Sequence, residues 1–261
     1  MGHLAAIAGL MLAFRLAGDR WAWLAVLFYA PRIVYALPAA LIAPALLLCG
    51  ARRWLWAPAL AVALVLGPMM GLRFSLPRSA PGPAVRLLSC NVWFGAGELE
   101  VLRDELVSAR PDIVVFQAAA HAADVLLKEP PFEKFNYLHD DQYVLASRWP
   151  ARVTGRGTFV SERLHRPWVR FEVDSPLGTL DVIAVHPHSP RRLFARGTLR
   201  ELVRAGPAGD PGGTLAFLRQ QLTEIAGAAR TSGPLLVLAG DFNVPDGGSL
   251  MADLFGDWTD S

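Results

Sequence analysis

Two apolar stretches near the start of the chain constrain its fold more than any other feature. Residues 33–51 and 54–72 each run for 19 residues without a charged side chain. A helix needs about 20 apolar residues to cross the hydrocarbon core of a bilayer, so both stretches predict transmembrane helices, separated by a tight turn at Arg52 and Arg53. Residues 1–18 are a third candidate span. Whether the chain has two spans or three stays open, as does the side of the membrane on which the rest lies.

The charged residues divide the chain just after these stretches. Residues 1–72 carry five Arg and one Asp, whereas the rest of the chain carries 20 basic and 22 acidic side chains. We therefore predict a membrane region over residues 1–73, a Pro-containing linker over residues 74–84 and a globular domain over residues 85–261. The slightly acidic balance of that domain argues against nonspecific nucleic-acid binding, since such domains are usually basic.

The globular part alternates short apolar runs with helical patterns. Leu99, Leu102 and Leu106 recur at the spacing of one helix face, and a second such stripe begins at Leu215. The apolar runs are typical of buried strands, and strands mixed with helices predict a layered α+β domain. Strands are predicted over residues 85–91, 112–117, 143–147, 158–160, 168–173, 179–185 and 235–239.

Five sequence blocks then occur in a recognisable order. They read LLSCNVW (87–93), PDIVVFQ (111–117), YVLASRWP (143–150), VIAVHPHSP (182–190) and VLAGDFNVP (237–245). In this order they resemble the endonuclease/exonuclease/phosphatase superfamily, which includes deoxyribonucleases, abasic-site endonucleases, sphingomyelinases and inositol-phosphate phosphatases. The resemblance implies that the α+β domain is a four-layer α/β/β/α sandwich, incomplete at its C-terminus.

The resemblance also implies a chemistry, the hydrolysis of phosphoester bonds with Mg²⁺ or Mn²⁺. By motif, Asp241 would orient or deprotonate the attacking water, and Asn243 would donate hydrogen bonds to the phosphate. Asn91 would lie near the metal, and His186 would stabilise phosphate charge or transfer a proton. Taken one by one, these residues also fit structural roles, such as an Asx turn, a strand end or a structural histidine.

Two departures from the family pattern bear on activity. The second block of the family normally reads Gln-Glu, with the glutamate as principal metal ligand, but here Gln117 is followed by Ala118, and a methyl group cannot bind a hard cation. Family members also continue to a Ser-Asp-His block with a catalytic histidine, which this chain does not reach before Ser261. We expect either a fragment of a longer product or a truncated remnant, and a non-catalytic pseudoenzyme is the alternative to an enzyme.

These features combine into one expectation of function. The chain is predicted to be an integral protein of a bacterial plasma membrane, with the lipid bilayer and a phosphoester substrate as its partners. The membrane region and the acidic domain favour a lipid-like or small phosphoester over duplex DNA.

Overall fold

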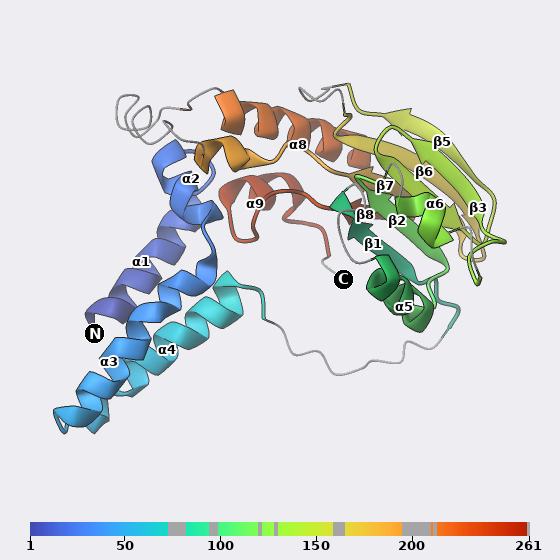
Figure 1. The fold of residues 1–261 in the computed structure, drawn as a ribbon. Helices are drawn as coiled ribbons and strands as arrows, with labels where there is room; N and C mark the ends of the chain where they lie inside the picture. Colours follow the sequence, from blue (N-terminus) through green and yellow to red (C-terminus); the bar gives the residue numbers. More distant parts are fainter. Residues whose placement is uncertain are drawn as a thin grey trace. The chain divides into compact units, whose positions relative to one another are not determined.

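The structure is a computed structural model that describes residues 1–72, 82–93, 99–119, 122–127, 130–158, 165–194, 210 and 213–259. Its chain forms two compact units (Figure 1). Of the predicted linker 74–84, only residues 82–84 lie within the described part. One unit, here the helical unit, combines Met1–Pro77, Pro190–Phe217 and Val244–Ser261, and the other, here the sandwich unit, combines Arg78–Ser189 and Leu218–Asn243.

The helical unit is built around an apolar core in which α1 packs against α2 and α4. Ile7 and Phe14 of α1 meet Phe28 of α2 and Val65 in this core, and the rings of Phe14 and Phe28 lie edge to face. The unit contains α1 (Gly2–Ala17), α2 (Ala22–Tyr29), η1 (Arg32–Ala36), α3 (Leu37–Leu48), η2 (Arg52–Trp54), α4 (Trp56–Leu64), the π-helical turn η3 (Val65–Met69), η5 (Pro190–Phe194) and α9 (Ser249–Phe255).

The helices predicted over residues 33–51 and 54–72 are shorter in the structure. η1 and α3 together end at Leu48, and Gly50 follows in the left-handed region with φ +70°. α4 and η3 together end at Met69. Within the described residues, no single helix is both long and apolar enough to cross a bilayer, although α2 and the η1–α3 segment, bent by 86°, meet the length and composition criteria as a pair.

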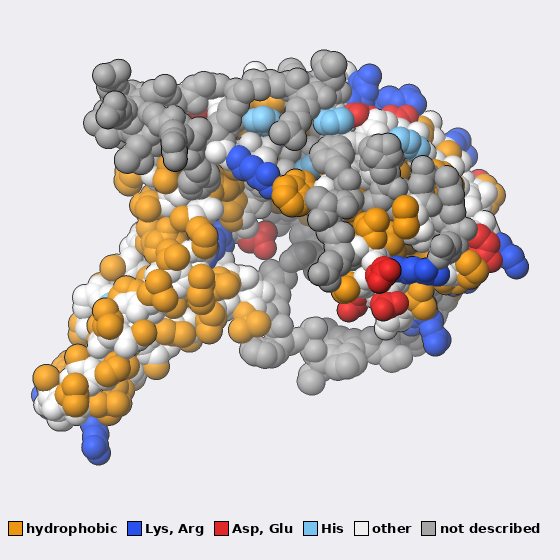
Figure 2. All heavy atoms as spheres, viewed as in Figure 1, with side chains coloured by type: hydrophobic (Ala, Val, Ile, Leu, Met, Phe, Trp, Pro, Cys, Tyr) orange, Lys and Arg blue, Asp and Glu red, His pale blue; other side chains and the backbone are white. Residues whose placement is uncertain are grey.

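Hydrophobic side chains nevertheless cover much of the surface of α3 and α4 in the view of Figure 2. On α3, Leu37, Leu41 and Leu48 expose 62%, 78% and 89% of their surface. A large exposed apolar surface is typical of a face that contacts lipid or another protein.

A buried carboxylate holds α9 to the first helices of the unit. Asp19 is only 2% exposed, and its two oxygens accept hydrogen bonds from the Ser249 hydroxyl (2.6 Å) and the Leu250 backbone N–H (2.5 Å). The first N–H groups of a helix have no partner within it, so Asp19 caps α9 from a distant part of the sequence. Arg20 adds an ion pair with Asp253 at 3.0 Å.

The described residues of the sandwich unit form two four-stranded sheets, ordered β1-β2-β4-β3 and β5-β6-β7-β8. β1 pairs with β2, and β7 with β8, in parallel, and the other pairs are antiparallel. The strands are β1 (Leu87–Asn91), β2 (Ile113–Gln117), β3 (Asn136–Asp140), β4 (Tyr143–Ser147), β5 (Ala151–Arg156), β6 (Trp168–Ser175), β7 (Gly178–Val185) and β8 (Leu236–Gly240), and the helices are α5 (Leu99–Ala109), α6 (Ala122–Leu127) and α8 (Thr214–Arg230), whose first residues belong to the helical unit.

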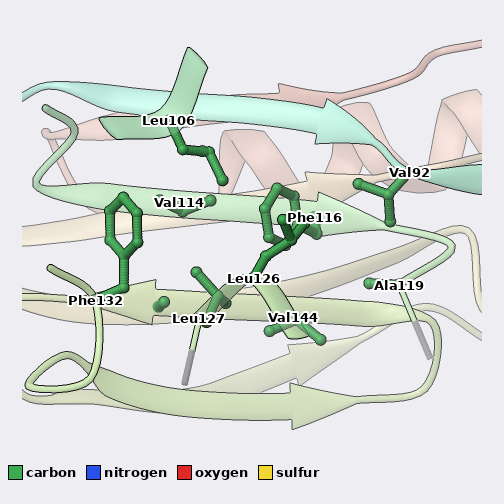
Figure 3. Packing of buried hydrophobic residues seen from close by; sticks show 10 residues of the cluster. Val92, Leu106, Val114, Phe116, Ala119, Leu126, Leu127, Phe132 and Val144 are labelled. Atoms are coloured by element: carbon green, nitrogen blue, oxygen red, sulfur yellow. The ribbon is translucent and has the colours of Figure 1, made fainter. Parts of the chain in front are cut away.

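Two cores hold these layers together. Successive residues of a strand point to opposite faces of its sheet, so one strand can contribute to a core on each side. Val115 of β2 and Phe171 of β6 lie in the core between the two sheets. Their neighbour Phe116 points the other way, against Leu106 of α5 and Leu126 of α6 (Figure 3).

α8 covers the outer face of the second sheet. Arg170 of β6 donates a hydrogen bond to the Ala228 carbonyl near the end of this helix. The layers therefore run helix, sheet, sheet, helix, which agrees with the predicted α/β/β/α arrangement.

Apart from shifts of one or two residues at strand ends, the strands differ from the prediction at three places. β3 and β5 form where no strand was predicted. In the opposite direction, Thr158 of the predicted strand 158–160 lies outside any strand, and its N–H donates to Glu224 of α8. Residues 159 and 160 lie outside the described part of the chain.

Candidate active site

Three of the predicted site residues meet at the carboxyl ends of strands from both sheets. Asn91 is the last residue of β1, and His186 and Asp241 directly follow β7 and β8. Because β7 and β8 are parallel and pair Val185 with Gly240, their next residues emerge side by side. The Asn91 amide lies 3.1 Å from Asp241 Oδ2 and 3.3 Å from His186 Nε2.

Gly240 makes the approach of Asp241 possible. Its φ is +146°, and a Cβ at this position would lie 2.0 Å from the Val185 carbonyl oxygen. Only glycine fits such a close contact between backbones. The glycine of the Gly-Asp-Phe-Asn block is therefore required by packing of β8 on β7.

The Asp241 carboxylate is also held by its own turn. Oδ1 accepts the backbone N–H of Asn243 at 2.9 Å, which is an Asx turn of the kind the sequence allowed. Asn243 adopts φ +54°, and its side-chain amide donates to the Pro187 carbonyl at 2.9 Å. Asn243 therefore reaches the site edge, where one of its functions is to tie the two strand ends together.

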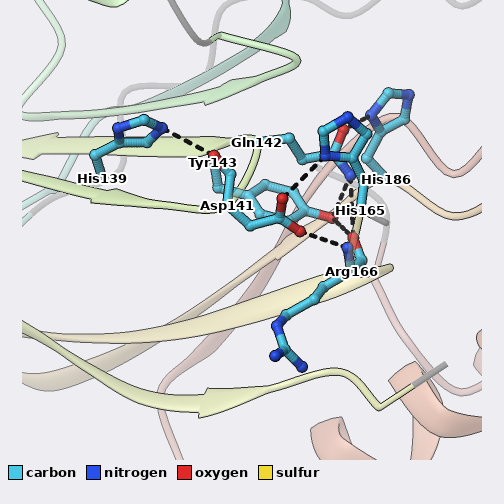
Figure 4. A network of polar contacts seen from close by, with 7 residues as sticks. All are labelled: His139, Asp141, Gln142, Tyr143, His165, Arg166 and His186. Atoms are coloured by element: carbon cyan, nitrogen blue, oxygen red, sulfur yellow. Dashed lines mark hydrogen bonds and ion pairs between the residues drawn. The ribbon is translucent and has the colours of Figure 1, made fainter. Parts of the chain in front are cut away.

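A buried glutamine orients His186 (Figure 4). The Gln142 amide nitrogen donates to the Arg166 carbonyl at 3.0 Å, so its oxygen faces His186 Nδ1 at 2.7 Å. Nδ1 must therefore carry the proton, and Nε2 is left as the nitrogen that faces the Asn91 amide. Gln142 has no place in the predicted site, because it stands just before a strand and belongs to none of the motifs.

Further hydrogen bonds hold the residues around Gln142. The Tyr143 hydroxyl also donates to the Arg166 carbonyl, and burial, followed by the nearby Asp141 charge, raises the Tyr143 pKa well above its usual value. Asp141 adopts φ +55° and accepts hydrogen bonds from the Arg166 N–H and from His165, the latter at 2.9 Å. Tyr143 therefore stays a neutral phenol and serves the site as a structural donor.

Ala118 lies at the same edge of the first sheet. The Gln117 carbonyl accepts the Val92 N–H, and the Ala119 N–H donates to the Gln142 carbonyl. Ala118 is thus flanked by the neighbours of Asn91 and by the partner of His186. Its side chain is only 1% exposed, and its φ is +51°.

The described residues do not fit a divalent-cation site. Within the described part of the chain, no group of three or more His, Cys, Asp or Glu side chains is placed to hold a metal ion. The Asn91 side-chain oxygen accepts the Trp93 N–H, and each Asp241 oxygen already accepts an N–H. Magnesium and calcium need several oxygen ligands, whereas the site offers one carboxylate.

Comparison with known proteins bears on the sandwich unit. The sequence model described as the Endonuclease/Exonuclease/phosphatase family matches residues 88–258, a range that includes all the site residues above. No curated protein matches the sequence.

Several solved structures resemble the chain at 16% sequence identity. A beta-hairpin deletion mutant of beta toxin from Staphylococcus aureus covers 67% of this chain and 72% of its own, with a TM-score of 0.45. A humanized TDP2 from D. rerio covers 66% and 70%, with a TM-score of 0.46. A beta toxin double mutant from Staphylococcus aureus with bound magnesium ions covers 66% and 69%, with a TM-score of 0.42.

Proposed function

Because this chain belongs to the endonuclease/exonuclease/phosphatase family, whose members hydrolyse phosphoester bonds, we propose that its sandwich unit hydrolyses a phosphoester. The observation that carries the proposal is the cluster of Asp241, Asn91 and His186, joined by contacts of 3.1 and 3.3 Å at one edge of the sandwich.

Asp241 is the group that orients the attacking water. An ionised carboxylate has about four acceptor positions, and the N–H groups of Asn91 and Asn243 take up two of them. The remaining positions can accept hydrogen bonds from a water molecule. The two N–H donors fix the direction in which Asp241 can act as a general base.

His186 presents Nε2 to the same space. The Gln142 oxygen holds the Nδ1 proton, so Nε2 is the atom that can accept a proton from the reacting groups or, once protonated, donate to a phosphate oxygen. Asn243 keeps the Pro187 carbonyl, and with it the turn after His186, in place.

The association with membranes is part of the same proposal. The exposed leucines of α3 and the charge-free stretches 33–51 and 54–72 support anchoring in a bacterial plasma membrane. Extraction of membranes with alkaline carbonate tests this: an anchored chain stays in the pellet, and release into the supernatant would contradict anchoring. A lipid-like or small phosphoester is the favoured substrate, since the part of the chain after residue 72 is slightly acidic.

Turnover by the full chain tests the activity. Bis(4-nitrophenyl) phosphate, phosphatidylglycerol vesicles and duplex DNA are offered separately, each with magnesium, with manganese and with a chelator, so that cation dependence is read in the same assay. Asp241→Asn should lower kcat by about 10²-fold or more, the usual contribution of a general base. Asp174→Asn, which alters an exposed carboxylate of β6, is the matched control and should leave kcat unchanged. Equal rates for wild type and Asp241→Asn would refute the proposal.

Ala118 specifically favours a second candidate, a non-catalytic domain that keeps the fold. It predicts that the wild-type chain turns over none of these substrates under any of the three conditions. Turnover that is lost in Asp241→Asn would exclude it.

A further inference from the structure

The backbone at position 118 adopts an uncommon conformation although the side chain is only a methyl group. Ala118 stands directly after β2 with φ +51°, a conformation that costs an alanine free energy relative to glycine. The hydrogen bond from Val92 N–H to the Gln117 carbonyl and that from Ala119 N–H to the Gln142 carbonyl hold it there. A longer side chain at this position would start between the residues next to Asn91 and the glutamine that orients His186.

The polar side chains of the site hydrogen-bond to one another. The Asn91 amide points its N–H groups at the Asp241 carboxylate and at His186 Nε2, while its oxygen accepts the Trp93 N–H. A cation at this place would meet the hydrogen-bearing end of the amide, which repels positive charge. The Asp241 carboxylate is therefore held by hydrogen bonds from uncharged N–H groups.

The residue directly before position 118 is also uncharged. Gln117, directly before Ala118, is fully buried, and its amide nitrogen donates to Ser89 at 3.0 Å. Its side-chain oxygen has no hydrogen-bond partner within the described part of the chain. Among the described residues at this strand end, Ser89 and Gln117 therefore supply polar groups but no charge.

From these observations we propose that the site holds no resident divalent cation, because position 118 supplies no ligand and the Asn91 amide turns its N–H groups, not its oxygen, toward Asp241 and His186. The inference rests on the phosphoester site of the proposed function and deepens it: phosphoester binding and turnover at this site proceed without a divalent cation. It also predicts that one substitution, Ala118→Glu, creates a cation site beside Asp241.

The experiment measures Mn²⁺ binding to the full chain in detergent micelles by the electron paramagnetic resonance signal of the free ion. Wild type and Asp241→Asn should bind equally little at millimolar Mn²⁺, so any weak binding elsewhere cancels in the comparison. Ala118→Glu should bind at least 10-fold more tightly than wild type, and Ala118→Glu/Asp241→Asn should lose that gain. Ala118→Gln, equal in size and without charge, is the matched control and should gain nothing.

Each outcome decides the proposal. Wild-type binding of Mn²⁺ that disappears in Asp241→Asn overturns it, as does wild-type phosphoester turnover that stops when a chelator is added. If circular dichroism shows that Ala118→Glu does not fold, the wild-type comparison alone decides. If Ala118→Glu folds and gains no Mn²⁺, the placement of position 118 in the site is refuted. Complete absence of turnover would refute the proposed hydrolysis, and the Mn²⁺ binding measurements would then test the absence of a cation on their own.

Discussion

Replacing Asn91 by Asp should replace the hydrogen bond between Asn91 and Asp241 with electrostatic repulsion between two carboxylates. Asn91 Nδ2 donates to Asp241 Oδ2 over 3.1 Å. An ionised aspartate has no donor, so Asn91→Asp would set a second carboxylate against the first at a similar distance. The stability of the sandwich should report this directly, since both residues follow or end strands of its two sheets.

Two energetic terms set the size of the destabilisation expected for Asn91→Asp. Removing a hydrogen bond to a charged group costs about 1.5–3 kcal/mol, and two unit charges about 4 Å apart repel by up to about 4 kcal/mol at an effective dielectric constant of about 20. Both side chains are partly exposed, so water screens the second term. We expect Asn91→Asp to lower the free energy of unfolding by about 3–6 kcal/mol near pH 8, and Asn91→Ala by only the first term, about 1.5–3 kcal/mol.

The difference between the two variants should depend on pH with a definite sign. Repulsion raises the pKa of the facing carboxyl groups in the folded protein above the value of about 4 in the unfolded chain. The extra destabilisation is therefore fully present above the folded pKa, decreases as the pH falls below it and is gone once the pH reaches the unfolded value, because one bound proton removes the repulsion. Near pH 5, where that proton costs about 1.4 kcal/mol, Asn91→Asp should lie within about 1.5 kcal/mol of Asn91→Ala.

Urea denaturation followed by circular dichroism at both pH values measures these quantities. The charge-swapped double variant Asn91→Asp/Asp241→Asn is the control, since it restores one carboxylate and one amide and should recover most of the lost stability at the higher pH. If Asn91→Asp is as stable as Asn91→Ala near pH 8, the amide and the carboxylate do not face each other and the reasoning about the site is wrong.

Further predictions concern packing and reactivity. Gly240→Ala should lower the free energy of unfolding by about 3 kcal/mol or more, since its Cβ would lie 2.0 Å from the Val185 oxygen; a loss below about 1 kcal/mol in urea would contradict the close approach. Phe171→Ala should cost about 3–5 kcal/mol in the same assay, and a loss under about 1.5 kcal/mol would show that the ring is not fully packed between the sheets. Asp19→Ala should speed amide hydrogen exchange over residues 249–255, whereas unchanged exchange would mean that α9 needs no cap. Burial raises the pKa of the Cys90 thiol, so iodoacetamide should alkylate it about an order of magnitude more slowly in the folded chain than in urea, and equal rates by mass spectrometry would contradict this.

Local patterns predicted the parts of the fold that local physics determines. β4 occupies residues 143–147 as predicted, because a short, continuous apolar run is buried on both faces. β3 was missed because Asn136–Asp140 is polar and largely exposed at the edge of its sheet. β5 alternates between half-buried and exposed residues, but its charged and small side chains hide that period.

The candidate site likewise contains residues that sequence motifs could select and one that only the folded structure reveals. Motif order was enough to select Asn91, His186 and Asp241, which the structure brings together. It could not select Gln142, whose importance lies in a contact with a residue 44 positions away. No sequence period records such a contact, because it arises only when the two sheets pack.

The cap that Asp19 provides to α9 matters for anyone who wishes to produce the sandwich unit without the apolar helices. A shortened gene that starts after residue 84 would look natural from the sequence, since it removes only the apolar region and its linker. It would also strip the acceptor from Ser249 and Leu250 and uncover the buried face of α9, which includes Phe255. Such a product would expose the apolar face of α9 after the Gly-Asp-Phe-Asn turn. If it were insoluble or inactive, the cause would be the place where the gene was cut.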